Sequence, residues 1–344
     1  MNNQLFLLYN WMVNSQGVNP YVAQFIFGLI VSFLLLSIPV VVATIVPLII
    51  KKPKKEFSIY LYSFITGMFI ILGSFGYLRE AIEITGTGKG LRGTNFQPWQ
   101  IYTYNIFIIV GGALIGILSA FSIKAIVYKI MKSKYQTNSI FVHTHEAGHH
   151  EHEQEHKHEH HDHIWNANDL ADVQGQNSLK TKNKLTALIL LLAHRIPEGL
   201  LIGLSLRSLT VNNNVSAISV AFFVSFVLHT IPEEIVFFYR QREMGISAFR
   251  ASLNSIFALS LIIPFIFIGL YGGSIIEAYP ALKALIMAIV GSVMIFTSFV
   301  EFLPEFYHHN LGKKRWFITL FMFFLGIVFT LFILSFHQHG AQLS

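Results

Sequence analysis

The chain has 344 residues, of which 53% are hydrophobic and only 12% are charged, and its mean hydropathy is +0.55. A soluble domain of this length needs more charge to cover its surface, so the composition excludes an ordinary soluble protein. Cysteine is absent, which excludes disulfides and cysteine metal sites. The net charge of +6 is not gathered in a basic, aromatic-rich surface segment, so we expect no nucleic-acid partner.

Eight apolar segments are long enough to cross the hydrocarbon core of a bilayer, which takes about 20 residues. We expect them at residues 22–50, 57–78, 103–130, 184–206, 215–239, 248–271, 281–303 and 315–336. They predict an all-α membrane protein, a single transmembrane domain over residues 1–344 that is surrounded by lipid. Residues 79–102 are expected to form a polar loop, and residues 131–183 form the longest polar stretch.

The distribution of lysine and arginine predicts the orientation of these spans. They gather at residues 51–56, around residues 131–183, between the fifth and sixth spans, and between the last two. The positive-inside rule places these connections in the cytoplasm, so both termini lie outside, as an even number of spans requires. Residues 1–20 lack the basic start of a cleavable signal peptide. That absence and the compact size favour a bacterial inner membrane.

Spans four and five carry the same polar cassette, His-x-x-Pro-Glu, at residues 194–198 and 229–233. In a helix, His and Glu at positions i and i+4 share one face. A charged carboxylate inside a bilayer is costly, so it normally faces a partner or a wet cavity. Two such faces offer two imidazoles and two carboxylates, which suit zinc or ferrous iron. The predicted metal ligands are His194, Glu198, His229 and Glu233.

The prolines of the two cassettes, Pro197 and Pro232, lack an N–H and clash with the carbonyls of Ala193 and Leu228. We therefore expect both helices to kink beside the ligands, with the freed carbonyls met by water, a side chain or an ion. A proline kink in a membrane helix is also common without any ligand. The repetition of proline together with His and Glu is what favours a metal site.

Ten histidines interleaved with acidic residues lie between spans three and four. They are His143, His145, His149, His150, His152, His156, His158, His160, His161 and His163. Their spacing is too irregular for one structural zinc site, and no apolar periodicity supports a fold. We interpret this cytoplasmic loop as metal-buffering or metal-sensing, since neutral imidazoles are ligands at cytoplasmic pH. A merely soluble linker is the alternative.

Eight spans, outside termini, the histidine-rich loop and the two cassettes together resemble the ZIP family of divalent metal transporters. The ends of two other spans support this. Span seven ends in Glu-Phe-Leu-Pro-Glu at residues 301–305, similar to the family's Glu-Leu-Leu-Pro-Glu. Span two ends in Leu-Arg-Glu-Ala at residues 78–81, like the family's Leu-Pro-Glu-Ala with Arg79 in place of the proline.

The resemblance implies a ZIP-like bundle in which spans four and five carry the metal. Spans one to three and six to eight would form pseudo-symmetric halves, and alternating access would move ions into the cytoplasm. The substrate would be Zn²⁺, with Fe²⁺, Mn²⁺ and Cd²⁺ left open because all accept His and Glu. No organic cofactor is expected, and a homodimer is left open.

The chain departs from the binuclear members of that family at three positions. Arg195 stands where they usually carry a metal-binding Asn, Thr230 where an acidic residue is common, and Ile263 where an acidic residue precedes the proline. A guanidinium is always charged and cannot coordinate a metal. Our hypothesis is that Arg195 occupies the second metal position as a built-in cation, so that one metal binds instead of two.

Partners for this cation are Glu198 and Glu301, and Glu234 is either a ligand or a further partner of Arg195. Glu301 is also a candidate for the exit path. Two alternatives stay open for Arg195. It faces a water-filled vestibule, or its charge repels the ion and transport is lost.

Three other functional classes have sequence features in common with this chain. A di-iron membrane oxidase would use Glu-x-x-His and more carboxylates. A cation diffusion facilitator exporter resembles six spans plus a soluble C-terminal domain, whereas the last span here ends near residue 336. A metal sensor that does not transport remains compatible with the arginine at position 195.

Overall fold

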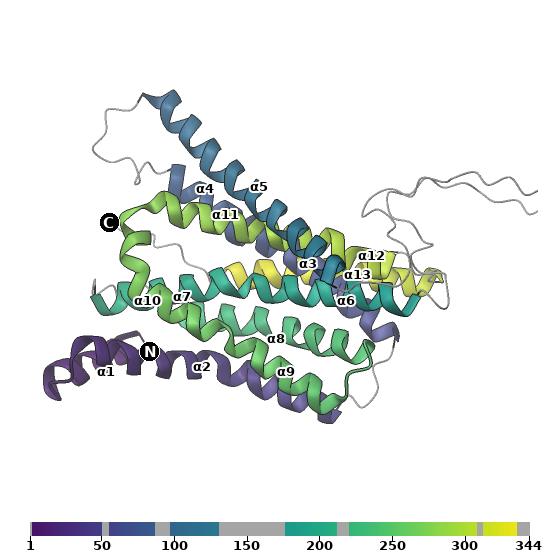
Figure 1. Ribbon diagram of the computed structural model, residues 1–344, viewed down its shortest axis with the longest axis horizontal. Coiled ribbons are helices and arrows are strands. Elements are labelled where there is room, and N and C mark those ends of the chain that lie inside the picture. The colour runs from purple at the N-terminus through teal and green to yellow at the C-terminus, as the bar shows by residue number, and fades with distance from the viewer. Residues whose placement is uncertain are drawn as a thin grey trace, which may run out of the picture.

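The computed structural model describes residues 2–49, 55–86, 97–130, 176–211, 220–307 and 312–335, and the regular elements within them are all helices. Most of these helices run along the long axis of one bundle, and α5 is inclined to the others (Figure 1). The predicted all-α fold is confirmed. The ten histidines of residues 143–163 lie outside the described residues.

The helices follow the expected spans closely, with short π-helical segments (η) inside or before three of them. In chain order they are α1 (Asn2–Asn10), η1 (Trp11–Ser15), α2 (Pro20–Ile49), α3 (Lys55–Ile71), η2 (Leu72–Leu78), α4 (Arg79–Gly86), α5 (Pro98–Ile130), α6 (Gln176–Ala193), α7 (Arg195–Val211), α8 (Val220–Glu243), α9 (Ala248–Ser260), α10 (Ile262–Ala278), α11 (Pro280–Thr297), η6 (Ser298–Phe302), α12 (Leu303–Tyr307) and α13 (Lys313–Ser335).

Within the described residues, seven stretches are long and apolar enough to cross a membrane. They are Pro20–Val46, Glu56–Gly86, Pro98–Val127, Leu185–Val211, Ala248–Ala278, Pro280–Tyr307 and Lys313–Ser335. The fifth expected span corresponds to α8, which is 24 residues long and packs against α2, α9, α3 and α13. The protein is thus a multi-pass membrane protein with a helix at each of the eight expected positions.

The expected polar loop at residues 79–102 is wrong at both of its ends. Span two continues as α4, and α5 begins at Pro98, a residue suited to the first turn of a helix. The charges of α4 are paired: Arg79 bonds Glu83 one turn later at 2.8 Å, and Glu80 lies 3.4 Å from Lys283 of α11. The pair formed by Arg79 and Glu83 has the spacing that supports a helix, where polarity alone suggested a loop.

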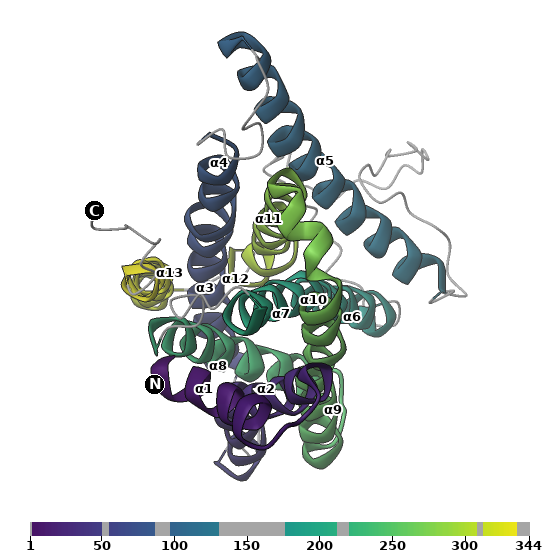
Figure 2. The ribbon, with the colours of Figure 1, turned by 90° about the vertical axis from the view of Figure 1, so that its left-hand side faces the viewer.

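The helices pack as two groups, which lie on different sides of the bundle when it is viewed along its axis (Figure 2). The ligand group contains α1, α2, α7, α8, α9 and α10, and the support group contains α3, η2, α4, α5, α11, η6, α12 and α13. Helix α6 lies between them. The packing groups therefore combine spans one, four, five and six against spans two, three, seven and eight. They differ from the consecutive halves, one to three and six to eight, that the resemblance implied.

Glycines allow the closest helix pairs to form. A Cβ at Gly203 of α7 would lie 2.1 Å from the Ile266 carbonyl oxygen, and a Cβ at Gly269 of α10 would lie 2.3 Å from the Leu200 carbonyl oxygen. Membrane helices associate through such small residues because lipid gives no hydrophobic drive between helices. The contact between α7 and α10 holds the second half of span four in place.

We expect Gly269→Ala to lower the stability of the detergent-solubilised protein by about 1–3 kcal/mol, since the added methyl meets backbone atoms that cannot move aside. The measurement is thermal unfolding followed by size-exclusion chromatography. Gly272→Ala is the matched control, because it lies on the same helix with no neighbour within 4 Å of its Cβ position. Equal melting temperatures for the two variants would contradict the packing argument.

Candidate metal centre

The two cassettes sit in different backbone settings. Span four is interrupted at His194, a turn residue between α6 and α7, three residues before Pro197. Helix α8 instead runs without interruption past Pro232. The helix of span four is therefore broken beside its proposed ligands. The helix of span five has no such break beside Pro232. In α8 the hydroxyl of Thr230 donates to the Phe226 carbonyl at 2.7 Å, which satisfies a polar group within its own helix.

The four predicted ligands are all buried and lie in two crossed pairs. His194 Nε2 lies 3.2 Å from Glu233 Oε2, and His229 Nε2 lies 2.7 Å from Glu198 Oε1. Each pair joins span four to span five, so the two cassettes interleave. The structure brings the four side chains together as two separate pairs between these spans.

A second contact sets the orientation of one imidazole. His229 Nδ1 lies 2.8 Å from the Ser225 carbonyl oxygen, which can only accept. Nδ1 therefore carries a proton, and the 2.7 Å contact between Nε2 and Glu198 Oε1 needs a second proton between these two atoms. Metal-binding histidines are commonly fixed in this way by a carbonyl behind the ring.

Three polar atoms at the site are buried without a hydrogen-bond partner: Glu233 Oε1, Glu234 Oε2 and Arg195 Nη1. Buried carboxylate oxygens without partners are costly and call for an explanation, of which a ligand is one. Among the described residues, however, no group of three or more His, Cys, Asp or Glu side chains is arranged to hold a metal ion. The ligands are present as two pairs and not as one closed coordination shell.

Arg195 and Glu234 form a buried ion pair next to the crossed pairs. Of the two roles considered for Glu234, the structure shows the partner of Arg195. Arg195 is itself buried in this structure. Glu301, which we also considered as its partner, lies in η6 and is instead paired with Lys124 of α5 at 3.0 Å.

Aromatic rings that the sequence analysis did not single out surround the imidazoles. The ring of Phe69 lies edge-on to His194 at 5.7 Å between centroids, and Phe226 lies edge-on to His229 at 5.4 Å. They come from α3 and α8 and keep the site apolar, which strengthens the charge interactions inside it. An apolar residue in an apolar helix gives no sequence pattern that would single it out.

Span six shows the same backbone feature as span four. The helix is interrupted at Leu261, three residues before Pro264, so that α9 and α10 are separate. Ile262 at the start of α10 packs on Gly199, where a Cβ would lie 2.7 Å from its carbonyl oxygen. Ile263, which stands where an acidic residue was expected, thus lies in a segment whose backbone packs against the start of α7.

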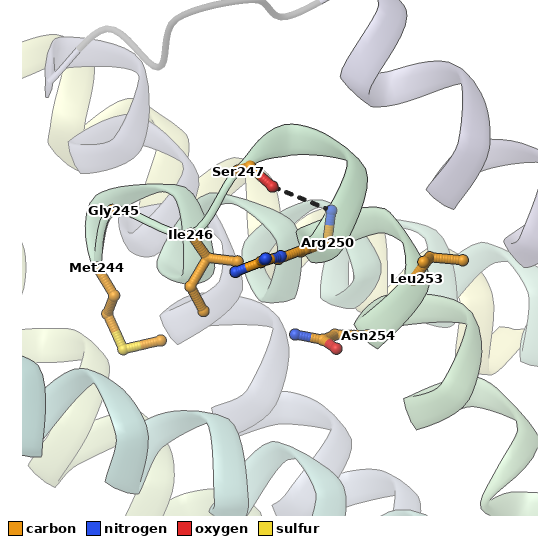
Figure 3. Close-up of a pocket in the computed structure, with 7 residues that line it drawn as sticks. All are labelled: Met244, Gly245, Ile246, Ser247, Arg250, Leu253 and Asn254. Atoms are coloured by element: carbon orange, nitrogen blue, oxygen red, sulfur yellow. Dashed lines mark hydrogen bonds between the residues drawn. The ribbon is translucent and has the colours of Figure 1, made fainter.

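A pocket of about 710 Å³ lies elsewhere, at the turn between α8 and α9 (Figure 3). It is lined by residues 244–247 and by Arg250, Leu253 and Asn254, none of which is a carboxylate or an imidazole. This pocket offers no ligands for a divalent metal.

A family model described as "ZIP Zinc transporter" matches residues 23–334, which is most of the chain. No curated protein matches the sequence.

Proposed function

Since the chain belongs to the ZIP zinc transporter family, we propose that it carries zinc into the cytoplasm through one metal site formed by His194, Glu198, His229 and Glu233. Membership makes the protein a multi-pass membrane transporter of divalent metal ions and not an enzyme. The identity of the ion, the direction of movement and the ligands are the parts that we propose.

The observation that carries the proposal is the crossed pairing of the two cassettes. Each histidine already lies within 3.2 Å of a carboxylate from the other span, and Glu233 has a second oxygen without a partner. A divalent ion placed between the pairs would replace the His–Glu contacts with metal–ligand bonds. His and carboxylate ligands suit zinc, and because both also bind protons, the affinity should fall as the pH falls.

The pair formed by Arg195 and Glu234 supports a site with one metal. It places a permanent cation, held by a carboxylate, beside the proposed ligands. A second divalent ion at this place would meet the guanidinium charge in a buried setting, where repulsion is poorly screened. In our proposal the arginine thus takes the charge-compensating role of a second metal and leaves one ion to be moved.

The test is uptake of radiolabelled zinc into proteoliposomes that contain the purified protein. Saturable uptake that unlabelled zinc competes for more effectively than iron(II), manganese or cadmium would support zinc as the substrate. Saturable uptake of one of the other ions, with zinc inactive, would replace zinc by that ion. Failure of all four ions to accumulate would favour the sensor alternative for this member of the family.

The histidine-rich loop is a second part of the proposal. We expect deletion of residues 143–163 to alter the apparent affinity or the response to cytoplasmic zinc more than the maximal uptake rate, because the proposed ligands lie in the membrane. The matched control replaces these residues with an acidic and serine-rich linker of equal length. Full recovery by that linker would make the segment a merely soluble connection.

A further inference from the structure

Arg240 of α8 is a charged side chain buried at the contact between the two helix groups, with only 1% of its surface exposed. Its guanidinium forms an ion pair with Glu305 of α12 and donates through Nη2 to the Glu301 carbonyl oxygen of η6 at 3.2 Å. It lies over the ring of Tyr62 of α3, 4.3 Å from the centroid, and 5.6 Å from that of Phe302. One residue of the ligand group thus touches three elements of the support group.

A second residue of α8 reinforces this contact. The hydroxyl of Tyr62 donates to Glu243 Oε2 at 2.9 Å, one turn beyond Arg240. Tyr62 is therefore held on its face by the guanidinium and at its hydroxyl by the carboxylate. Together, Arg240, Glu243, Tyr62 and Glu305 tie the end of α8 to α3 and α12, and we call these four residues the clasp.

Other ion pairs of the protein have a different placement. Four of them each join helices of the same group: Arg207 with Glu277, Lys124 with Glu301, Lys283 with Glu80, and Arg315 with Glu56. These pairs can stay intact when the groups move as units. The clasp cannot, because its partners lie on opposite sides of the contact.

We infer that the clasp is a closure between the ligand group and the support group that must open in every transport cycle. The proposed ligands lie on α7, α8 and the residue before α7, so changing their access from one side to the other requires movement against the support group. Arg240 is almost completely buried, whereas the side chain of Glu305 is 27% exposed, so separation of the pair is favourable only when water also reaches the guanidinium. The clasp therefore keeps Arg240 away from water until this end of the protein opens. Arg240 touches no metal ligand in this role and is a positioning residue.

The test uses the absence of cysteine from the chain. Arg240→Cys with Glu305→Cys places two thiols across the clasp, and a short bifunctional methanethiosulfonate joins them, since the long side chains they replace span more than a disulfide does. Zinc uptake should fall in proportion to the cross-linked fraction and return after reduction. The matched control joins Arg207→Cys to Glu277→Cys, a pair inside the ligand group, and should leave uptake unchanged. Full uptake by protein that is cross-linked at the clasp would overturn the inference.

Charge reversal gives a second measurement that does not depend on the cross-linker. Arg240→Glu alone should lower the maximal uptake rate and leave the equilibrium dissociation constant for zinc unchanged, and adding Glu305→Arg should restore the rate. If the reversed variant does not fold, Arg240→Lys keeps the charge but loses the planar stacking, and the same split between rate and binding is expected. Unchanged rates in folded variants, or a loss of zinc binding, would count against the clasp.

The Glu233→Ala variant separates this inference from the proposed zinc site, on which the uptake assay depends. Uptake that survives in Glu233→Ala would refute the proposed site and leave the clasp testable by the same cross-link. Uptake that is lost in Glu233→Ala but persists in protein cross-linked at the clasp would refute the clasp alone.

Discussion

Glu233→Ala is expected to abolish saturable zinc uptake. Glu233 is buried at the meeting point of spans four and five, pairs with His194, and has a second oxygen without a partner. Loss of residues that only orient metal ligands already costs about 10–100-fold in affinity, so loss of a direct ligand should cost at least as much. Uptake of radiolabelled zinc into proteoliposomes and equilibrium zinc binding in detergent measure the two effects.

Two companion variants make this result specific. Glu198→Ala removes the partner of His229 and should have the same outcome, because each crossed pair supplies one of the two proposed carboxylate ligands. Glu83→Ala removes a glutamate from an exposed pair on α4 and should behave as the parent does. Size-exclusion chromatography checks that each variant is folded. Parent-like uptake by folded Glu233→Ala protein would show that the ion does not use this carboxylate.

Arg195→Asn should raise the zinc content from one ion per chain to two. The substitution leaves Glu234 buried without its cation and adds an amide oxygen that can coordinate a metal. Without zinc, the uncompensated carboxylate should lower stability by about 3–5 kcal/mol, the range for breaking a buried ion pair. Added zinc should recover this loss, since a ligand that binds only the folded state stabilises it. Metal analysis of the purified protein and thermal unfolding with and without zinc measure the two effects.

The double variant Arg195→Asn with Glu234→Gln is the matched control. It removes both charges, so it should regain most of the stability without zinc and should still bind one ion. A zinc content of one in the single variant, with parent-like stability, would mean that Arg195 does not replace a metal. If the single variant binds two ions but no longer takes up zinc, transport needs the arginine, which keeps the site at one ion that can move.

Local properties of the sequence predicted much of this protein. Hydropathy over about 20 residues located the spans, because each helix must satisfy its own backbone in the membrane. The spacing of His and Glu singled out the four proposed ligands, because i and i+4 positions share a face whatever surrounds them. Polarity alone failed at residues 79–86, where pairing of charges within α4 and with α11 supports a helix.

The tertiary structure decided which of these residues meet. Glu234 and not Glu301 pairs with Arg195, Glu301 pairs with Lys124, and Arg240 reaches across the two helix groups. These contacts depend on how far each helix is turned and shifted against its neighbours. Close packing at glycines such as Gly203 and Gly269 sets those shifts, and this packing joins residues that are about 65 positions apart in the chain. The sequence therefore determined which functional side chains each helix carries. The packing of the bundle determined which partners those side chains contact.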